Sequence, residues 1–253
     1  MIITKAINDT DNWYVYNSAS GVGKFSYLNL SNGEATSATA YSAVDATTFT
    51  ANLSNNSGIN MISYCFASVA QYSSIGTYTG NGSINGPIVN TGFEPAFLMT
   101  KQTNTTSNWV IVDNKRSTTN PRNKGLRPNT DDTESTVGDN MVVDFLTNGF
   151  QLKQTSGAND NGGTFLYIAF ASDASAAPTL PDSFATALYA GNNTSQSIAG
   201  LGFSPSLVWI KNRGSAQSHS WTDSVRGNDL VLQSNETAAE ATGQITLDTD
   251  DLL

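Results

Sequence analysis

Short runs of Val, Ile, Phe, Tyr and Thr, separated by Gly, Asn and Asp, recur along the chain, whereas the 3.6-residue period of an amphipathic helix is hard to find. Runs of this length with turn residues between them are typical of strands in β-sandwiches and barrels. The clearest are NWYVYN (12–17), FLMTK (97–101), WVIVDN (109–114), VVDFLT (142–147), GTFLYIAFA (163–171) and LVWIKN (207–212). The pattern predicts an all-β protein.

The same sequence motifs recur along the chain at intervals of about 105–110 residues. Gly-Phe-x-Pro, an apolar run and a Lys occupy residues 92–101 and again 202–211, and an Asp and an Arg follow in the same register. An Asn five residues before a Glu then recurs at 29–34, 129–134 and 235–240. Such internal repetition indicates copies of one structural unit.

The N-terminal stretch belongs to the same series. Lys5 precedes Trp13 by eight residues, as Lys101 precedes Trp109. The sequence therefore predicts three tandem modules, each an antiparallel β-sandwich. Their bounds are 1–75 for a first module without its opening strands, 76–172 for a complete second module, 173–186 for an Ala/Ser/Pro-rich linker, and 187–253 for a third module without its closing strands.

Incomplete modules would leave backbone groups unpaired at a sheet edge. Two explanations stay open at this point. The chain is part of a longer polypeptide, or the open third module is completed by the open first module of a neighbouring molecule through strand exchange.

The amino-acid composition limits the classes of partner that the chain is expected to bind. Ser, Thr and Asn supply 86 of the 253 residues, charged residues only 13%, and the net charge is −9. Nucleic acid and anionic membranes are therefore not expected as partners, because both require clustered Lys and Arg. No apolar run is long enough for a membrane helix, the N-terminus lacks the features of a signal peptide, and a single cysteine allows no disulfide within the chain.

The repeat-matched polar residues are the candidate site, and we interpret them as structural. An Asp and an Arg three residues apart at a strand end would tie the strand to its following loop through charge-assisted hydrogen bonds. The tryptophans Trp13 and Trp109 are expected to be half-buried, and His219 takes the tryptophan slot in the third copy. The matched residues are Lys101, Trp109, Asp113 and Arg116 in the second copy and Lys211, Asp223 and Arg226 in the third.

Catalytic and metal chemistry find little support in the sequence. His219 is the one histidine, and no Gly-x-Ser-x-Gly elbow accompanies it, so a Ser-His-Asp triad is not expected. Acidic clusters at 131–134 and 248–251 lack the EF-hand spacing of a calcium loop and are interpreted as solvated acids. Cys65 matches Ala169 and is expected to be a small buried side chain. We therefore predict no catalytic residue, no cofactor and no metal ligand.

The combined phrases resemble modules of tail-fibre and other virion-appendage proteins of bacteriophages, marine and cyanobacterial phages in particular. They are YTGNGS (78–83), GFEPAFLMTK (92–101), NWVIVDNKR (108–116), VDFLTNGFQL (143–152) and GLGFSPSLVWIKNR (200–213). The resemblance implies a lectin-like or jelly-roll β-sandwich for each module, repeated along an extracellular appendage. It also implies a structural role in the virion with attachment to host-surface glycans, and assembly as a homo-oligomer, a trimer above all, with other virion proteins. It supplies no catalytic residues.

Two other functions remain open. A tail-spike depolymerase would need a pair of carboxylates in a groove to cleave host polysaccharide. A cellular adhesin or filament subunit would assemble by strand complementation between copies.

Overall fold

The computed structural model describes residues 1–53, 57–135, 141–171, 184–227, 229–243, 245 and 247. The linker predicted at 173–186 lies mostly outside this part of the chain. The predicted all-β fold is confirmed: the described residues form antiparallel sheets and one short 3-10 helix, η1 (Gly157–Asn159). None of their helical segments has the length and apolar character to cross a membrane.

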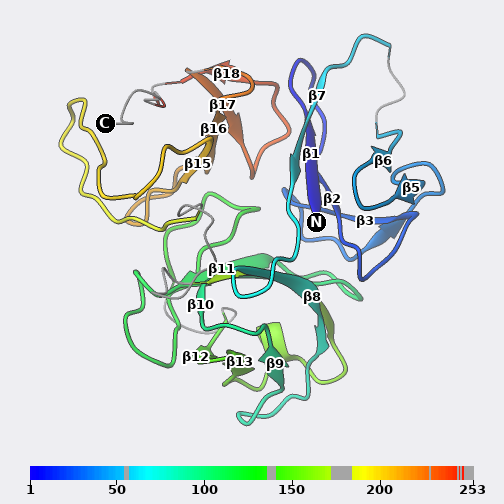
Figure 1. Cartoon of the computed structure of the whole chain (residues 1–253), viewed down its shortest axis with the longest axis vertical. Coiled ribbons are helices and arrows are strands. Elements are labelled where there is room, and N and C mark those ends of the chain that lie inside the picture. The colour runs from blue at the N-terminus through cyan, green and yellow to red at the C-terminus, as the bar shows by residue number, and fades with distance from the viewer. Residues whose placement is uncertain are drawn as a thin grey trace.

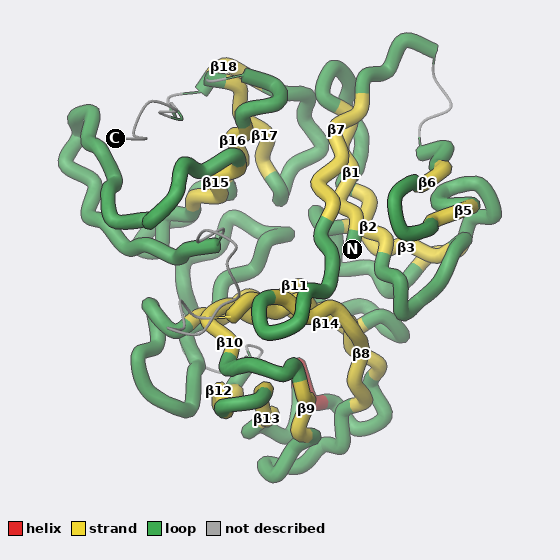
Figure 2. The backbone as a smooth tube through the Cα atoms, viewed as in Figure 1, coloured by secondary structure: helices red, strands yellow, loops and turns green. Residues whose placement is uncertain are grey.

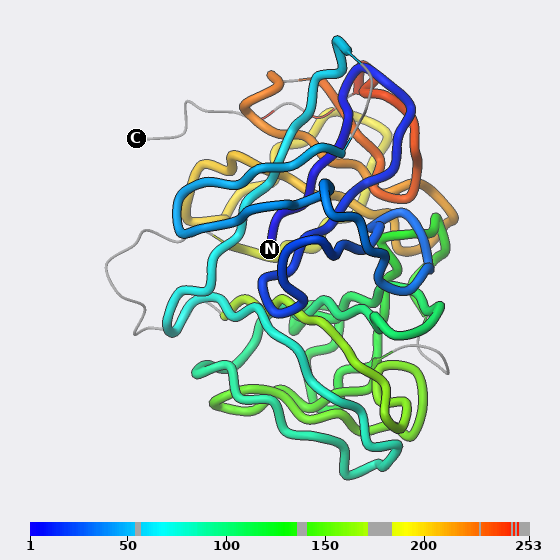
Figure 3. Tube along the Cα trace, turned by 90° about the vertical axis from the view of Figure 1, so that its right-hand side faces the viewer, coloured from blue at the N-terminus to red at the C-terminus, as the bar shows by residue number. Residues whose placement is uncertain are grey.

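The three copies form three lobes around a common centre, with the first copy in blue, the second in green and the third in yellow to red (Figure 1). The view turned by 90° shows the second copy below the other two (Figure 3). The first copy has a sheet ordered β4-β3-β2-β1-β7 and a separate hairpin, β5-β6. Its strands are β1 (Ile2–Ala6), β2 (Tyr14–Tyr16), β3 (Lys24–Tyr27), β4 (Ala35–Thr36), β5 (Ala43–Val44), β6 (Phe49–Thr50) and β7 (Met61–Cys65).

The second copy is a two-layer sandwich, with a sheet ordered β11-β10-β14-β8 facing a sheet ordered β12-β13-β9. Alternate residues of its central strands face the two sides, as a strand's period of two requires. Its strands are β8 (Ser73–Thr79), β9 (Ile88–Asn90), β10 (Pro95–Gln102), β11 (Trp109–Asp113), β12 (Val143–Leu146), β13 (Gly149–Leu152) and β14 (Thr164–Ala171).

The third copy has one sheet ordered β15-β16-β17-β18 in the described part of the chain. Residues 184–206, which precede this sheet, run as loop (Figure 2). The strands are β15 (Leu207–Ile210), β16 (Ser220–Asp223), β17 (Leu230–Gln233) and β18 (Ala241–Thr242).

One hairpin recurs in all three copies with an unchanged register. Strands β1 and β2, β10 and β11, and β15 and β16 pair so that the residue before the repeated Lys faces the residue after the repeated Trp or His. These facing pairs are Thr4 with Tyr14, Thr100 with Val110, and Ile210 with Ser220. Both glycines of the Gly-Phe-x-Pro phrase, Gly92 and Gly202, have φ near +85°, a conformation that glycine adopts without steric cost.

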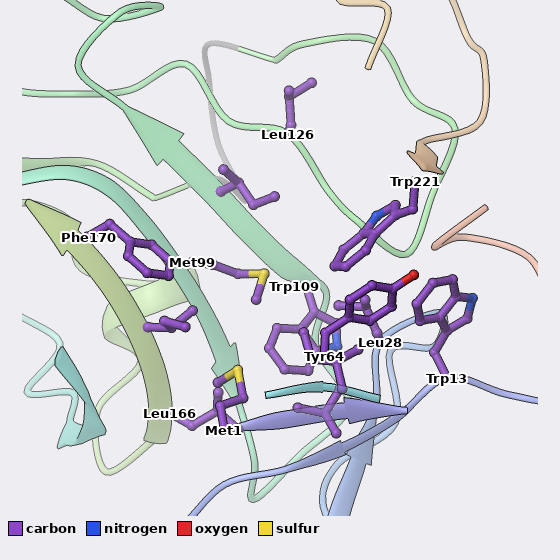
Figure 4. Close-up of a cluster of buried hydrophobic side chains, with 14 of the residues drawn as sticks. Met1, Trp13, Leu28, Tyr64, Met99, Trp109, Leu126, Leu166, Phe170 and Trp221 are labelled. Atoms are coloured by element: carbon purple, nitrogen blue, oxygen red, sulfur yellow. The ribbon is translucent and has the colours of Figure 1, made fainter. Parts of the chain in front are cut away.

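The three copies share one apolar core, and the first and second copies each have a further core of their own. One cluster of buried side chains includes Trp13 from the first copy, Met99 and Trp109 from the second, and Trp221 from the third. Figure 4 shows Trp13, Tyr64 and Trp221 side by side in this core. The boundary predicted between residues 75 and 76 falls inside strand β8, whose pairing with β14 begins at Ser73.

Two expectations about burial were wrong. Trp13 and Trp109 are fully buried rather than half-buried, because their indoles point into the shared core. Cys65 is exposed, although the matching Ala169 is buried. Cys65 lies on β7, the edge strand of its sheet, whereas Ala169 lies on β14, which has a strand on each side.

Candidate functional site: the ring of repeat-matched side chains

Two of the repeated lysines, Lys5 and Lys101, are buried, whereas the matching Lys211 is partly exposed. Lys5, Lys101 and Lys211 each donate from Nζ to the carbonyl of the following residue, at 2.6, 2.7 and 2.9 Å. Lys101 also reaches the carbonyl of Ser31 in the first copy, and Lys211 that of Asp131 in the second, at 3.2 and 3.0 Å. Burial lowers the pKa of both Lys5 and Lys101 to about 8.

The residue at the repeated Trp position makes a hydrogen bond to a different copy in each case. This residue is Trp13 in the first copy, Trp109 in the second and His219 in the third. Trp109 Nε1 donates to the carbonyl of Tyr27 at 2.7 Å, and Trp13 Nε1 donates to the carbonyl of Gln233 at 3.0 Å. His219 Nε2 lies 3.0 Å from the carbonyl of Arg127. These three acceptors occupy one matched position, two residues before the repeated Asn.

The tautomer of His219 follows from its second contact. Trp209 Nε1 donates to His219 Nδ1 at 2.9 Å, so Nδ1 is unprotonated and Nε2 carries the hydrogen. Burial, with the charge of Lys211 beside it, lowers the pKa of His219 to about 3. The neutral imidazole therefore replaces the indole N–H of the other copies, and both its nitrogens are engaged in holding the fold.

Within each copy, the repeated Asn hydrogen-bonds to the backbone of the residue at the Trp position. The side-chain oxygen of Asn29, Asn129 and Asn235 accepts the backbone N–H of Trp13, Trp109 and His219, at 2.9, 3.0 and 2.9 Å. Each amide also donates to the side chain of the residue before the slot, at 2.7–3.0 Å. The Asn therefore fixes the loop that carries the carbonyl acceptor for the next copy.

Backbone hydrogen bonds also join the three copies into a ring, in which each copy is bonded to the other two. Ser107 donates to Ser31 at 2.8 Å, Gln217 to Asp131 at 3.0 Å, and Asp11 to Thr237 at 2.9 Å. The second copy thus binds the first, the third binds the second, and the first binds the third. A second set of backbone hydrogen bonds joins the same pairs of copies in the opposite donor direction. Glu34 donates to Thr103, Glu134 to Arg213 and Glu240 to Ile7, at 2.7, 3.0 and 2.9 Å. The three copies are related by a pseudo-threefold axis within one chain.

The repeated Asp and Arg form a buried network at the end of the hairpin. Asp113 accepts the backbone N–H of Arg116 at 2.8 Å and also its Nε, while Asp223 accepts the same two groups of Arg226 at 2.9 and 2.6 Å. Each guanidinium then reaches the repeated Glu, Arg116 to Glu134 and Arg226 to Glu240, both at 3.2 Å. The Asp therefore ties the strand to its following loop.

The first copy lacks this network. Asn17 and Ser20 stand where the other copies have the Asp and the Arg. Glu34 pairs instead with Lys24, at 3.5 Å, and the Lys24 side chain is about half exposed. An ion pair at the surface replaces a buried one in this copy.

Two further contacts join the copies at single positions. Arg213 holds Glu134 through two hydrogen bonds of 2.8 and 2.7 Å, from the third copy to the second. Burial opposes ionisation of Glu134, but the hydrogen bonds from Arg213 and the charge of Arg116 outweigh it and lower its pKa. Tyr64 of the first copy donates to Asp223 of the third at 2.7 Å.

The matched side chains hold the fold together through bonds to one another and to backbone carbonyls. No group of three His, Cys, Asp or Glu side chains in the described ranges could hold a metal ion. A pocket of about 350 Å³ lies beside β17 and β18, and its lining contains no ionisable side chain. It is lined by Ser220, Val231, Gln233, Ala238, Ala239, Ala241, Thr242, Gly243 and Ile245.

The acidic clusters divide into three cases. Glu134 is largely buried in the ion-pair network, so the interpretation of this cluster as solvated acids was wrong for Glu134, whereas Asp132 is an exposed partner of Arg127 at 3.4 Å. Asp131 contributes its backbone carbonyl to the ring. The cluster at 248–251 lies outside the described residues.

Sequence comparison supplies a family without a known function. A family model described as a domain of unknown function (DUF7483) matches residues 1–174 and 180–251. The first matched segment contains the first two copies and the second contains the third. No curated protein and no solved structure matches the chain.

Proposed function

We propose that this chain, which belongs to the DUF7483 family, is a non-enzymatic structural protein of a virion appendage of the tail-fibre type, with a role in attachment to the host surface. One observation carries the proposal on the structural side: the repeat-matched charged and polar groups are engaged with one another and with backbone carbonyls. Groups held in this way contribute to the stability of the fold. The phage-like phrases of the sequence supply the virion assignment.

The exposed surface supports a role in glycan attachment. It is rich in hydroxyl and amide side chains, and it exposes aromatic rings such as Tyr189 at 47% and Phe49 at 37%. Sugars stack on aromatic rings and hydrogen-bond to amides, and weak contacts gain strength when many copies act together. We propose that the chain acts within a homo-oligomer, a trimer, together with other virion proteins.

Immunogold electron microscopy of virus particles tests the virion assignment. Antibody raised against the chain should label the tail or another appendage of intact particles. Label confined to host-cell debris, with none on particles, would exclude a virion protein.

Glycan binding has a separate readout. The isolated chain should bind host-surface polysaccharide feebly on an array, and the assembled appendage should bind host cells firmly. Release of reducing ends from that polysaccharide by the purified chain would instead support the depolymerase alternative.

The strand-complementation alternative has one specific observation in its favour. Strand β15 is an edge strand in the described part of the chain, while the matching strands β1 and β10 are interior.

A further inference from the structure

One loop of the second copy concentrates positive charge in an otherwise acidic chain. This basic loop, residues 114–128, follows β11 and contains five of the twelve Lys and Arg residues but no Asp or Glu. The spacing from the position of Asp113 to the repeated Asn is 16 residues in this copy and 12 in each of the other two. The matching segments, 18–28 and 224–234, carry a single basic residue each. The second copy therefore has a longer and more basic loop at this place.

The basic loop also holds the cations that the rest of the described chain leaves without a carboxylate. Every Lys and Arg side chain outside Lys115, Arg122 and Lys124 has a carboxylate or a backbone carbonyl as a partner. Within the described ranges the ammonium groups of Lys115 and Lys124 have no such partner. Arg122 donates to the carbonyl of Ser117, its Nε has no partner, and no described carboxylate pairs with it. Three positive charges in one loop are thus available to an anionic ligand.

The backbone of the basic loop is held in place by its own side chains and by strand β12. Ser117 Oγ accepts the backbone N–H groups of Asn123 and Lys124 at 3.3 and 3.2 Å, so the two arms of the loop lie against each other. The side chain of Asn120 makes two hydrogen bonds with the backbone of Phe145, at 2.7 and 2.9 Å. A loop fixed in this way loses little entropy when a ligand binds.

Arg122 is the buried member of the three cations. It is only 7% exposed, and its Cζ lies 5.4 Å from the centre of the Phe145 ring, in a cation–π contact. Its backbone exchanges hydrogen bonds of 2.7 and 3.0 Å with Val143. A buried guanidinium without a carboxylate is unfavourable for the fold. A negative charge brought close to the loop would therefore stabilise the chain.

The surface of the basic loop combines cations with neutral hydrogen-bonding groups. Lys115 is exposed, as are Thr118 and Thr119, and Asn123 and Lys124 are partly exposed. Cations interspersed with hydroxyls and amides suit a polysaccharide that carries acidic groups on some of its sugars. Double-stranded DNA has one charge for about every 1.7 Å of its length and needs a denser set of cations.

The net charge of −9 does not prevent an anion from binding here. Salt screens charges that lie farther away than the Debye length, which is about 8 Å at physiological ionic strength. The carboxylates in contact with the loop are already paired, Asp113 and Glu134 with Arg116, and Asp132 with Arg127. The field beside the loop is therefore set by its own unpaired cations.

We propose that the basic loop binds an acidic polysaccharide of the host surface. Lys115 and Lys124 contact the anionic groups of the glycan, and Arg122 adds its charge from the interior. The inference rests on the proposed function of glycan attachment and names the class of glycan, one that carries carboxylate, sulfate or phosphate groups.

Affinity gel electrophoresis of the full chain tests the proposal, because a polysaccharide held in the gel slows a protein that binds it even weakly. Alginate, with carboxylates, and dextran sulfate are the acidic probes, and unmodified dextran is the neutral one. At least one acidic probe should retard the chain in a saturable way, and added sodium chloride should weaken the retardation. Dextran should leave the mobility unchanged. The acidic probe that retards the chain more identifies the anionic group.

Two double variants separate the loop from the net charge. K115Q/K124Q removes two cations from the basic loop, and K24Q/K153Q removes two partly exposed cations elsewhere. Both proteins have the same net charge. The apparent dissociation constant for the acidic probe should rise about tenfold in the first variant and less than about twofold in the second. Each mobility is compared with that of the same protein in a gel without polysaccharide, and melting temperatures show that both variants fold.

Three results would overturn the proposal. The first is equal retardation of K115Q/K124Q and the wild-type chain by the acidic probes. The second is no retardation of the wild-type chain by either acidic probe, and retardation by dextran in that case would leave glycan attachment in place. The third is a single-stranded DNA oligonucleotide that binds as tightly as the acidic probe and is lost in K115Q/K124Q, because the partner would then be nucleic acid.

Discussion

The imidazole of His219 donates to the carbonyl of Arg127 across the boundary between the third and second copies, at 3.0 Å. The indoles of the other two copies make the same bond at the matched position. Indole and imidazole therefore make the same hydrogen bond. The position requires an N–H donor rather than one particular residue type. The pseudo-threefold arrangement of the copies tolerates this substitution, because indole and imidazole are both flat, buried and able to donate an N–H.

The single histidine should make stability depend on pH above the range where carboxylates titrate. The pKa of His219 is about 3 in the folded chain and near the ordinary value of 6.5 in the unfolded chain, so the unfolded state binds the extra proton between these values. Stability is full above pH 6.5 and falls as the pH drops toward 3. Urea unfolding should show a loss of about 2 kcal/mol between pH 6.5 and pH 5.

A non-titrating variant isolates that effect. His219→Gln should be less stable than wild type at pH 7 and should lose much less stability between pH 6.5 and pH 5. An identical slope in the two proteins would show that another group titrates.

The buried lysine at the contact between the first and second copies should be needed for stability. Lys101→Met removes the donor that binds the Gln102 carbonyl and one of the two donors of the Ser31 carbonyl, which keeps the backbone N–H of Ser107. We expect a loss of about 1–3 kcal/mol in the free energy of unfolding, since a buried acceptor without a partner is costly. Chemical denaturation measures the loss.

Lys153→Met is the matched control. Lys153 is about 30% exposed and lies 3.9 Å from Asp144, so its removal should cost less than about 0.5 kcal/mol. Equal effects at the two positions would contradict the role given to Lys101.

Removing one member of a buried ion pair should cost more than removing both. Asp113→Ala leaves the buried guanidinium of Arg116 with Glu134, at 3.2 Å, as its remaining carboxylate, which should cost about 3 kcal/mol. The double variant D113A/R116S takes away that buried charge and carries serine where the first copy has Ser20. It should be more stable than D113A alone in urea unfolding. Additive losses would show that the two side chains act independently.

The ion pair between Arg213 and Glu134 should couple the third copy to the second. Its two hydrogen bonds form a bidentate contact, and Glu134 is largely buried. A double-mutant cycle with Arg213→Ala and Glu134→Gln should give a coupling free energy of about 1–2 kcal/mol.

The same cycle on Lys24 and Glu34 provides the comparison. That pair is longer and more exposed, so its coupling should stay below about 0.5 kcal/mol. A coupling at Arg213 and Glu134 no larger than this would mean that the bidentate contact adds nothing to the ring.

The strands and their repetition could be predicted from the sequence because both are local properties. Alternating apolar runs specify strands through the period of two, and glycines such as Gly92 and Gly202 mark turns through their positive φ. The repeated Asp and Arg could be identified as a pair because they are three residues apart. Their spacing brings Asp113 and Arg116 together whatever the rest of the chain does.

Only the tertiary structure showed that the copies close into a ring. The bond from Trp109 to Tyr27 joins residues 82 apart in the chain, and the bond from Trp13 to Gln233 joins residues 220 apart. Their acceptors are backbone carbonyls, which every residue carries, so no residue type marks them in the sequence. The exposure of Cys65 could not be predicted for a related reason, since it depends on whether another strand pairs beside β7.

The sequence by itself determined that one strand pattern was written three times, with the same polar residues at matched positions. The tertiary structure decided what those residues hold: each copy donates its indole, imidazole or ammonium hydrogen to a neighbouring copy, and the cycle closes within one chain. The physical reason is distance along the polypeptide. Side-chain periodicity acts within a strand, whereas the ring depends on loops brought together from opposite ends of the chain.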